Sequence, residues 1–152
     1  MVVNMGREED KINTERLKIR LLEEKDADFI VKMRNQKNII RYFLSPHGIT
    51  KEEHLQWFQT KYLVDNTYWK YIVEERNTGN LIGNIGIRDI DVEKSQAEVE
   101  YMFLEEYQGK GYACEAVAGL CNYATEQWGI KNFTAVIHVE NKSSEKLVEN
   151  LG

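Results

Sequence analysis

A glycine-bearing stretch at residues 108–113 (QGKGYA) combines residue types and a position that suit the binding of an anion. It follows an alternating apolar run, residues 97–104, typical of a strand, and precedes an alanine-rich amphipathic run, residues 114–128, which predicts a helix ending at Gly129. A turn at this junction leaves backbone N–H groups unpaired at the positive end of the helix dipole. The pattern predicts a phosphate or pyrophosphate site. The alternative is that the glycines only allow a tight turn from strand to helix, without a bound ligand.

Two carboxylates precede this turn on the predicted strand. Glu98 and Glu100 lie two residues apart, so their side chains project from the same face of a strand. On a strand that borders a substrate channel, either carboxylate could accept a proton directly or through water. The alternative is that one or both simply lie on an exposed face of the sheet.

The composition is that of one ordinary globular domain. The chain has 152 residues, enough for a single well-buried core, of which 42% are hydrophobic and 30% charged. Its net charge of −5 and the lack of a basic stripe argue against nucleic acid as a partner. A GxxxxGK[ST] motif does not occur, which excludes a P-loop nucleotide-binding protein.

Membrane, export and metal signals are also missing from the sequence. No run reaches the roughly 18 apolar residues of a membrane helix. Acidic residues in MVVNMGREEDK stand where a signal peptide has its apolar core, so we expect a cytoplasmic protein. Cys114 and Cys121 lie about 10 Å apart along one predicted helix, too far for a disulfide. Two Cys and three scattered His are too few for a metal site, so none is expected.

The expected elements follow the order β-α-α-β-β-β-α-β-α, which indicates a three-layer α/β fold with a mixed sheet. We divide the chain into a polar leader, residues 1–13, and one domain, residues 14–152. The expected strands are 17–21, 68–74, 81–87, 96–104 and 133–139; the expected helices are one opened by Asp26, one opened by the capping box Thr50-Lys51-Glu52-Glu53, then 114–128 and 143–150.

With its surroundings, the glycine-bearing stretch resembles the signature of the GNAT superfamily of acetyl-CoA-dependent N-acetyltransferases: Gln or Arg, two residues, Gly, one residue, then Gly or Ala. The resemblance covers residues 16–152. Within the superfamily, the sequence is similar in particular to the branch that includes the ribosomal-protein N-terminal acetyltransferases. Further matching residues are Glu115, Ala116, Asn141, Ser144, Leu151 and Gly152. It implies a three-layer α/β/α fold with a mixed, largely antiparallel sheet.

The resemblance implies acetyl-CoA as cosubstrate, with its pyrophosphate on the amides of the loop, Lys110 adding positive charge, and its pantetheine arm along the preceding strand. The residues expected to bind it are Met102, Phe103, Leu104, Gln108, Gly109, Lys110, Gly111, Tyr112, Ala113, Asn141 and Ser144. A wedge between that strand and strand 133–139 would admit the arm. Asn141 and Ser144 also suit the capping of the last helix.

The implied reaction is direct attack of a primary amine on the acetyl thioester. Glu98 is expected to be the base, with Glu100 as the second candidate. The Tyr with which the family often protonates the departing thiolate is absent, since the corresponding turn reads Glu145-Lys146-Leu147-Val148, so Ser144 or water would take its place.

Residues 33–58 resemble the acceptor-side helices of GNAT enzymes that acetylate nucleotide-linked 4-amino sugars. The expected acceptor-binding residues are Arg34, Asn35, Tyr42, His54 and Trp57. The alternative is that the aromatic residues belong to the core and that His54 lies in solvent. The acceptor would be a small amino sugar or nucleotide sugar, or a protein N-terminal amine.

The family continues past the Leu-Gly at residues 151–152 into two more strands, which this sequence lacks. We therefore expect a domain truncated at its C-terminus, with an exposed strand edge that a partner could cover, as a second copy would in a homodimer. The alternative to an enzyme is a non-catalytic acyl-CoA-binding or interaction module of the same fold.

Overall fold

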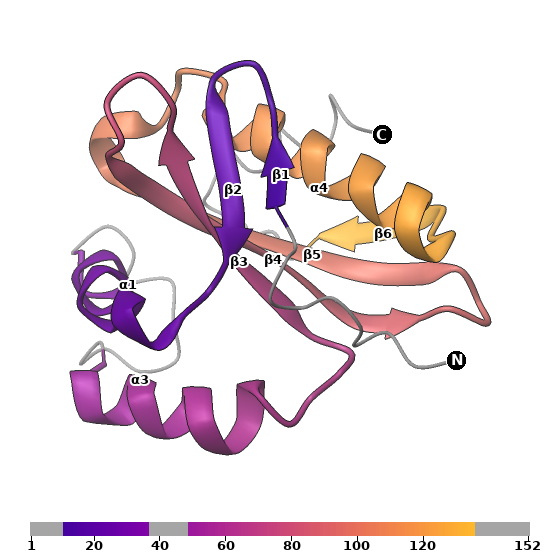
Figure 1. The fold of residues 1–152 in the computed structure, drawn as a ribbon, viewed down its shortest axis with the longest axis horizontal. Helices are drawn as coiled ribbons and strands as arrows, with labels where there is room; N and C mark the ends of the chain where they lie inside the picture. The colour runs from indigo at the N-terminus through magenta and orange to yellow at the C-terminus, as the bar shows by residue number, and fades with distance from the viewer. Residues whose placement is uncertain (1–10, 37–48, 136–152) are drawn as a thin grey trace.

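A six-stranded sheet forms the centre of the computed structural model, which describes residues 11–36 and 49–135 (Figure 1). The strands are β1 (Lys11–Asn13), β2 (Leu17–Leu21), β3 (Trp69–Glu75), β4 (Leu81–Asp91), β5 (Gln96–Phe103) and β6 (Asn132–Ala135). They lie side by side in chain order. Every neighbouring pair is antiparallel except β5 and β6, which are parallel. The expected mixed, largely antiparallel sheet is confirmed.

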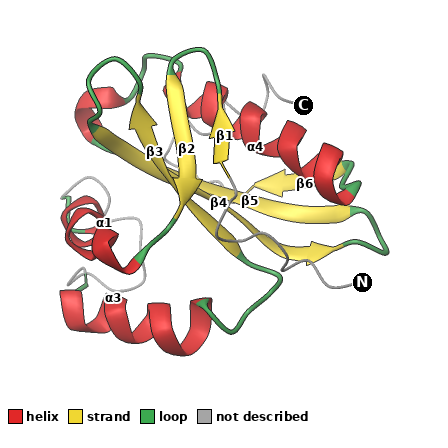
Figure 2. Cartoon of the chain, viewed as in Figure 1, coloured by secondary structure: helices red, strands yellow, loops and turns green. Residues whose placement is uncertain are grey.

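Helices cover both faces of this sheet, which confirms the three-layer α/β/α arrangement (Figure 2). The long helix α4 covers one face, and α1 and α3 lie against the other. The helical segments are η2 (Glu24–Asp26), α1 (Ala27–Arg34), α3 (Lys51–Trp57), η3 (Phe58–Tyr62, a π-helical continuation of α3), η4 (Glu105–Tyr107) and α4 (Tyr112–Trp128).

The two faces of the sheet bury separate cores, because side chains alternate along each strand. Trp69 and Tyr71 of β3 are buried in the core that includes Leu120 of α4, whereas Ile72 is buried on the other face in the core that includes Met33 of α1. The sheet therefore has an α4 face and an α1/α3 face, and each strand residue belongs to one of them.

Polar residues fix the two helices on the α1/α3 face. The Thr50 hydroxyl accepts a hydrogen bond from the Glu53 backbone N–H (3.1 Å), and the Glu53 carboxylate accepts one from the Thr50 N–H (2.9 Å). The expected capping box is thereby confirmed. The buried Asp26 accepts two hydrogen bonds from the Arg20 guanidinium of β2 (2.8 and 2.7 Å), which ties the start of α1 to the sheet.

The expected leader is too long, because residues 11–13 form β1. This strand pairs with β2, and Ile12 is buried in the core under α4. Gly119 of α4 permits the close approach, since a Cβ at this position would lie 2.9 Å from Cγ2 of Thr14. A three-residue strand with one apolar residue shows too little alternation to be found from sequence.

The remaining expected elements are confirmed within the described residues, with small shifts of their ends. The last strand begins at Asn132 and is described as far as Ala135; the expected helix at 143–150 lies outside the described chain. Both cysteines are free thiols. None of the helices within residues 11–36 and 49–135 is long and apolar enough to cross a bilayer.

Candidate active site

The glycine-bearing loop connects the end of β5 to the start of α4. Gly109 (φ 75°) and Gly111 (φ 82°) both adopt the left-handed conformation that glycine tolerates best. The Gln108 side-chain amide donates a hydrogen bond to the Phe103 carbonyl (3.1 Å), which ties the loop to β5. Residues 108–111 are all exposed, so their backbone faces solvent.

The first turn of α4 is suited to an anion. Gly111 is the N-cap and has no side chain with which to cap the helix, so the amides of the first turn lack intrahelical acceptors and a side-chain cap. The Glu115 amide is the first to bond back into the helix, to the Gly111 carbonyl (3.1 Å). N–H groups without intrahelical acceptors and the positive end of a 17-residue helix dipole therefore meet at one place.

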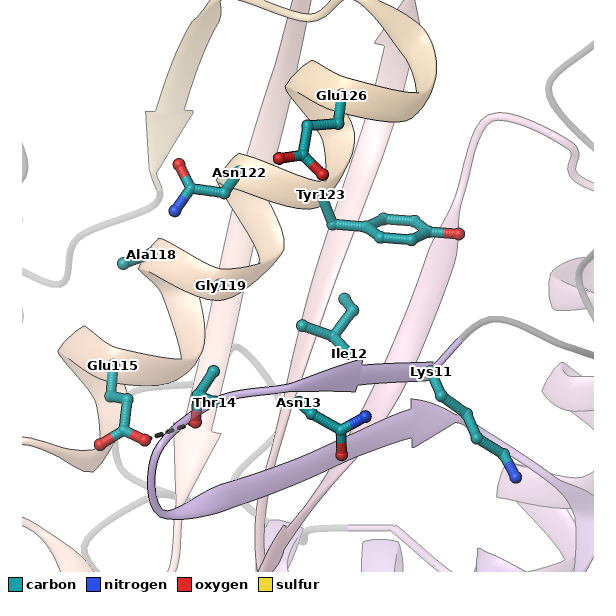
Figure 3. Close-up of a pocket in the computed structure, with 10 residues that line it drawn as sticks. All are labelled: Lys11, Ile12, Asn13, Thr14, Glu115, Ala118, Gly119, Asn122, Tyr123 and Glu126. Atoms are coloured by element: carbon teal, nitrogen blue, oxygen red, sulfur yellow. Dashed lines mark hydrogen bonds between the residues drawn. The ribbon is translucent and has the colours of Figure 1, made fainter.

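A clamp formed by Arg16 and Glu115 holds this loop from the β1–β2 turn. The Glu115 carboxylate accepts hydrogen bonds from the Thr14 hydroxyl (Figure 3), the Arg16 backbone N–H (2.8 Å) and Arg16 Nε (2.6 Å). Arg16 Nη1 also donates to the Lys110 carbonyl (3.0 Å), and its guanidinium stacks 4.3 Å from the centre of the Tyr112 ring. One arginine thus contacts both the loop and the first turn of α4.

The α1/α3 face of the sheet carries the two carboxylates of β5. Val99 and Phe103 are buried on the α4 face, so Glu98, Glu100 and Met102 lie on the other. The expectation that Glu98 and Glu100 share a face is confirmed. Glu98 is half-buried and lies opposite Arg88 in the β4–β5 register.

Glu100 is held by three side chains: Tyr68, just before β3, Lys70 of β3 and Arg88 of β4. Its carboxylate accepts hydrogen bonds from the Tyr68 hydroxyl (2.7 Å) and Lys70 Nζ (2.9 Å), and Arg88 Nη1 lies 3.5 Å away. Gly86, opposite Glu100 on β4, leaves room for this arrangement, because a Cβ there would lie 3.0 Å from Glu100 Cγ. The Glu100 carboxylate is therefore already compensated by cations of the chain itself.

These contacts keep Glu100 ionised. Burial alone would raise its pKa, but the Lys70 charge and the hydrogen bonds from Tyr68 and Lys70 outweigh it and lower the pKa from 4.5 to about 2. A carboxylate with so low a proton affinity is a weak general base, because efficient bases have a pKa near the working pH. The ion pair with Lys70 gives Glu100 a structural role.

Three of the side chains expected to bind the acceptor, Arg34, His54 and Trp57, approach the same face from α1 and α3. Arg34, at the end of α1, is half-buried near Tyr68 and Glu100, and burial lowers its pKa. The Trp57 ring packs against those of His54 (5.6 Å between centroids) and Tyr68 (6.0 Å). His54 is 4% exposed, so the alternative that it lies in solvent is wrong.

Comparison with known proteins decides the family. The acetyltransferase (GNAT) domain matches residues 16–152. The chain belongs to the GNAT acetyltransferases. It is an enzyme of the acyltransferase class, and the expected family is confirmed.

Among relatives of this GNAT chain, the N-acetyltransferase YnaD of Bacillus subtilis is 30% identical over 141 residues, covering 93% of this chain and 81% of the relative. A spermidine N(1)-acetyltransferase of Vibrio cholerae is 28% identical over 136 residues, covering 90% and 78%. The crystal structure of spermidine N-acetyltransferase from Vibrio cholerae in complex with CoA and spermine aligns with a TM-score of 0.80 at 26% identity, covering 91% of this chain and 81% of that one.

The expected cofactor residues of the GNAT chain lie together in the structure where they are described. Met102 and Phe103 end β5, Leu104 follows it directly, and residues 108–113 follow after η4. Several of their main-chain groups are already engaged: the Phe103 carbonyl by the Gln108 side chain, the Leu104 N–H by the Ile82 carbonyl (2.9 Å), the Leu104 carbonyl by the Tyr107 N–H (2.9 Å) and the Gln108 N–H by the Glu105 carbonyl (3.1 Å). Tyr42, Asn141 and Ser144 lie outside the described residues, as does most of the strand that would form the expected wedge.

Asn35 is engaged in holding the acceptor-side helices together. Its side-chain amide donates to the Ile49 carbonyl (3.0 Å), and its oxygen accepts from the Ile49 N–H (2.8 Å). Both ends of the segment between α1 and α3 are tied by this one side chain. This contact supports a structural role for Asn35.

Sequence reasoning missed Arg16, Tyr68 and Lys70 as parts of the site. Lys70 could have been noticed, because it is a charged residue within the apolar run of the expected strand 68–74. Arg16 gave no local signal, since its partners lie more than ninety positions later in the sequence.

A groove of about 460 Å³ between β1 and α4 lies apart from the acceptor face (Figure 3). Lys11, Asn13, Asn122 and Glu126 are among the side chains that line it. Of the expected cofactor and acceptor residues that the structure describes, none borders this groove. Within the part of the chain that the structure describes, no three His, Cys, Asp or Glu side chains come together to hold a metal ion.

The buried His54 predicts a pH dependence of stability. Burial, with the charges of Lys70 and Arg34, lowers its pKa from 6.5 to about 4, so the folded state binds this proton less well than the unfolded state. The contribution of the neutral His54 to the free energy of unfolding is full above pH 6.5 and is lost as the pH falls toward 4. Between pH 7 and 4.5, chemical unfolding should show wild type losing roughly 2 kcal/mol more than His54→Met. If the free energies of unfolding of the two proteins changed in parallel with pH, His54 would not have a lowered pKa in the folded state.

Proposed function

We propose that this GNAT enzyme transfers an acetyl group from acetyl-CoA directly to the primary amine of a small amino sugar or nucleotide sugar. The observation that carries the proposal is the loop at residues 108–113, which leads into the uncapped start of α4 shortly after the strand that bears Glu98. The loop amides would bind the pyrophosphate of CoA, and the thioester would then lie along β5. The solved relative bound to CoA supports this cofactor.

The chemistry follows from this placement. The amine nitrogen attacks the carbonyl carbon of the thioester, the bond from that carbon to sulfur breaks, and the CoA thiolate leaves and takes up a proton from water or from Ser144. Glu98 would accept the proton that the amine releases. Glu98 suits this role better than Glu100, because it lies outside the ion pairs that hold Glu100.

The charges on the acceptor side favour an amino sugar over a polyamine such as spermidine. A polyamine carries several ammonium groups and is bound best by several uncompensated carboxylates. On the described part of this face, Glu100 is compensated by Lys70 and Arg88, and Arg34 adds a further cation nearby. The Trp57 ring would offer a sugar an aromatic surface. A sugar nucleotide would bring the phosphates that these cations attract.

A panel of acceptors tests the proposal through release of the CoA thiol. The panel contains spermidine, peptides with free N-terminal Ser or Ala, an amino sugar, and the same sugar linked to a nucleoside diphosphate. We expect kcat/KM for the better of the two sugars to exceed that for spermidine by roughly tenfold, the equivalent of about 1.4 kcal/mol. Spermidine or a peptide as the fastest acceptor would refute the amino-sugar assignment. CoA binding without turnover of any amine would favour the non-catalytic module.

A further inference from the structure

Arg16 contacts the cofactor loop from a distant part of the sequence. Its Nη1 donates to the Lys110 carbonyl at 3.0 Å across a separation of 94 residues. Its Nη2 lies 3.3 Å from the position that a Cβ on Gly111 would occupy. The guanidinium is fixed in turn by Glu115 Oε1 (2.6 Å) and by stacking on the Tyr112 ring. Arg16 is therefore itself held firmly while it holds the loop.

The hydrogen bond to the Lys110 carbonyl sets the direction of the next amide. In a trans peptide, the C=O and N–H bonds point in opposite directions. With its carbonyl directed at Arg16, the Lys110–Gly111 peptide directs the Gly111 N–H to the opposite side, away from the guanidinium. Gly111 gives this peptide little intrinsic resistance to rotation, because the rotation changes φ of Gly111 and glycine accepts both signs of φ. The restraint therefore has to come from outside the loop.

We infer that Arg16 is a positioning residue for the cofactor: it fixes the Lys110–Gly111 peptide so that the Gly111 N–H is directed at the pyrophosphate of acetyl-CoA. This inference rests on the proposed function of the loop. Arg16 acts through the orientation of the peptide, because Glu115 already balances its charge. A lysine cannot reproduce this role, since one ammonium does not offer the flat set of N–H donors that reaches both the carboxylate and the carbonyl.

CoA affinity provides the first test, because it requires no knowledge of the acceptor. Isothermal calorimetry should give roughly tenfold weaker binding for Arg16→Met, and at least about threefold weaker binding for Arg16→Lys, which keeps the charge. Lys18→Met is the matched control, because it removes an exposed cation two residues further along the chain, in β2, and should leave the Kd unchanged. Circular dichroism melts establish that each variant is folded at the temperature of the titration.

A second measurement observes the peptide itself. Lys110–Gly111 is the only Lys-Gly pair in the sequence, so carbonyl-¹³C lysine with ¹⁵N glycine labels this single peptide bond. We expect one sharp amide signal in free wild type that shifts on addition of CoA. In Arg16→Met and Arg16→Lys the signal should broaden or split before CoA is added, because the peptide samples both orientations.

The outcomes separate the inference from the proposed function. Wild-type protein that fails to bind CoA would refute the proposed function. Wild-type protein that binds CoA, with Arg16 variants of unchanged Kd, would overturn the inference alone. Variants that bind weakly but keep one sharp, unshifted Gly111 signal would also overturn it, because they would show that Arg16 acts by some means other than peptide orientation.

Discussion

Replacing Gly111 with valine should weaken CoA binding by roughly tenfold or more, because the loop would lose the backbone conformation that exposes its amides. Gly111 has a φ of 82°, which β-branched residues rarely adopt. A Cβ there would also lie 3.3 Å from Nη2 of Arg16, so the added side chain would displace the guanidinium that restrains the loop. Calorimetric titration with CoA measures the effect.

Gly129→Val is the matched control for this prediction. Gly129 caps the other end of α4 with a φ of 70°, and no atom lies within 4 Å of its Cβ position. Both variants should lose stability through the same backbone strain, but only Gly111→Val should lose CoA affinity. Equal affinity losses in the two variants, or none in Gly111→Val, would contradict a role of this loop in binding the pyrophosphate.

Glu98→Gln should lower kcat by roughly a hundredfold, the lower end of what a general base contributes, and leave the KM for acetyl-CoA nearly unchanged. The substitution removes a proton acceptor but keeps the size of the side chain and touches none of the loop contacts. Steady-state kinetics with the best acceptor of the panel, as a function of acetyl-CoA concentration, separate the two parameters. Near-wild-type turnover at pH 7 would show that the base lies elsewhere or that water takes the proton.

Glu100→Gln is the companion variant and should act mainly on stability. Without the carboxylate, the Lys70 ammonium stays largely buried and loses its ion pair, which should cost about 3 kcal/mol. Because the folded-state pKa of Glu100 is about 2 and its ordinary value is 4.5, the difference from wild type should be full above pH 4.5 and shrink as the pH falls toward 2. A stable Glu100→Gln variant that has lost turnover would indicate that Glu100, and not Glu98, is the base.

The elements that sequence reasoning found are those whose signals are local. The capping box at Thr50 and the helix stop at Gly129 depend on residues a few positions apart, so a short window contains the whole pattern. The glycine loop was found for the same reason. Its position after a strand and before a helix could be read from periodicity alone.

The parts that sequence reasoning missed depend on contacts across the sheet. The environment of Glu100 comes from Lys70 of β3, Arg88 of β4 and Tyr68, which directly precedes β3, and nothing in the alternation of β5 distinguishes Glu100 from Glu98. The burial of His54 depends on how α3 lies on the sheet, since the helical pattern of residues 51–57 alone allows either face. The role of Glu100 and the burial of His54 depend on tertiary packing, which cannot be inferred from local patterns in one sequence.

The clamp between Arg16 and Glu115 ties the loop at residues 108–113 to a turn that is far away in the sequence. Its hydrogen bonds join residues 94 to 101 positions apart, so they require the β1–β2 turn and the start of α4 to be side by side, as they are in the folded domain. Closing so long a loop is slow and entropically costly. During synthesis, the Gln108–Ala113 segment would emerge as an unrestrained turn and become able to select CoA only when the two ends of the domain meet. We therefore expect the proposed CoA site to be completed late in the folding of this chain.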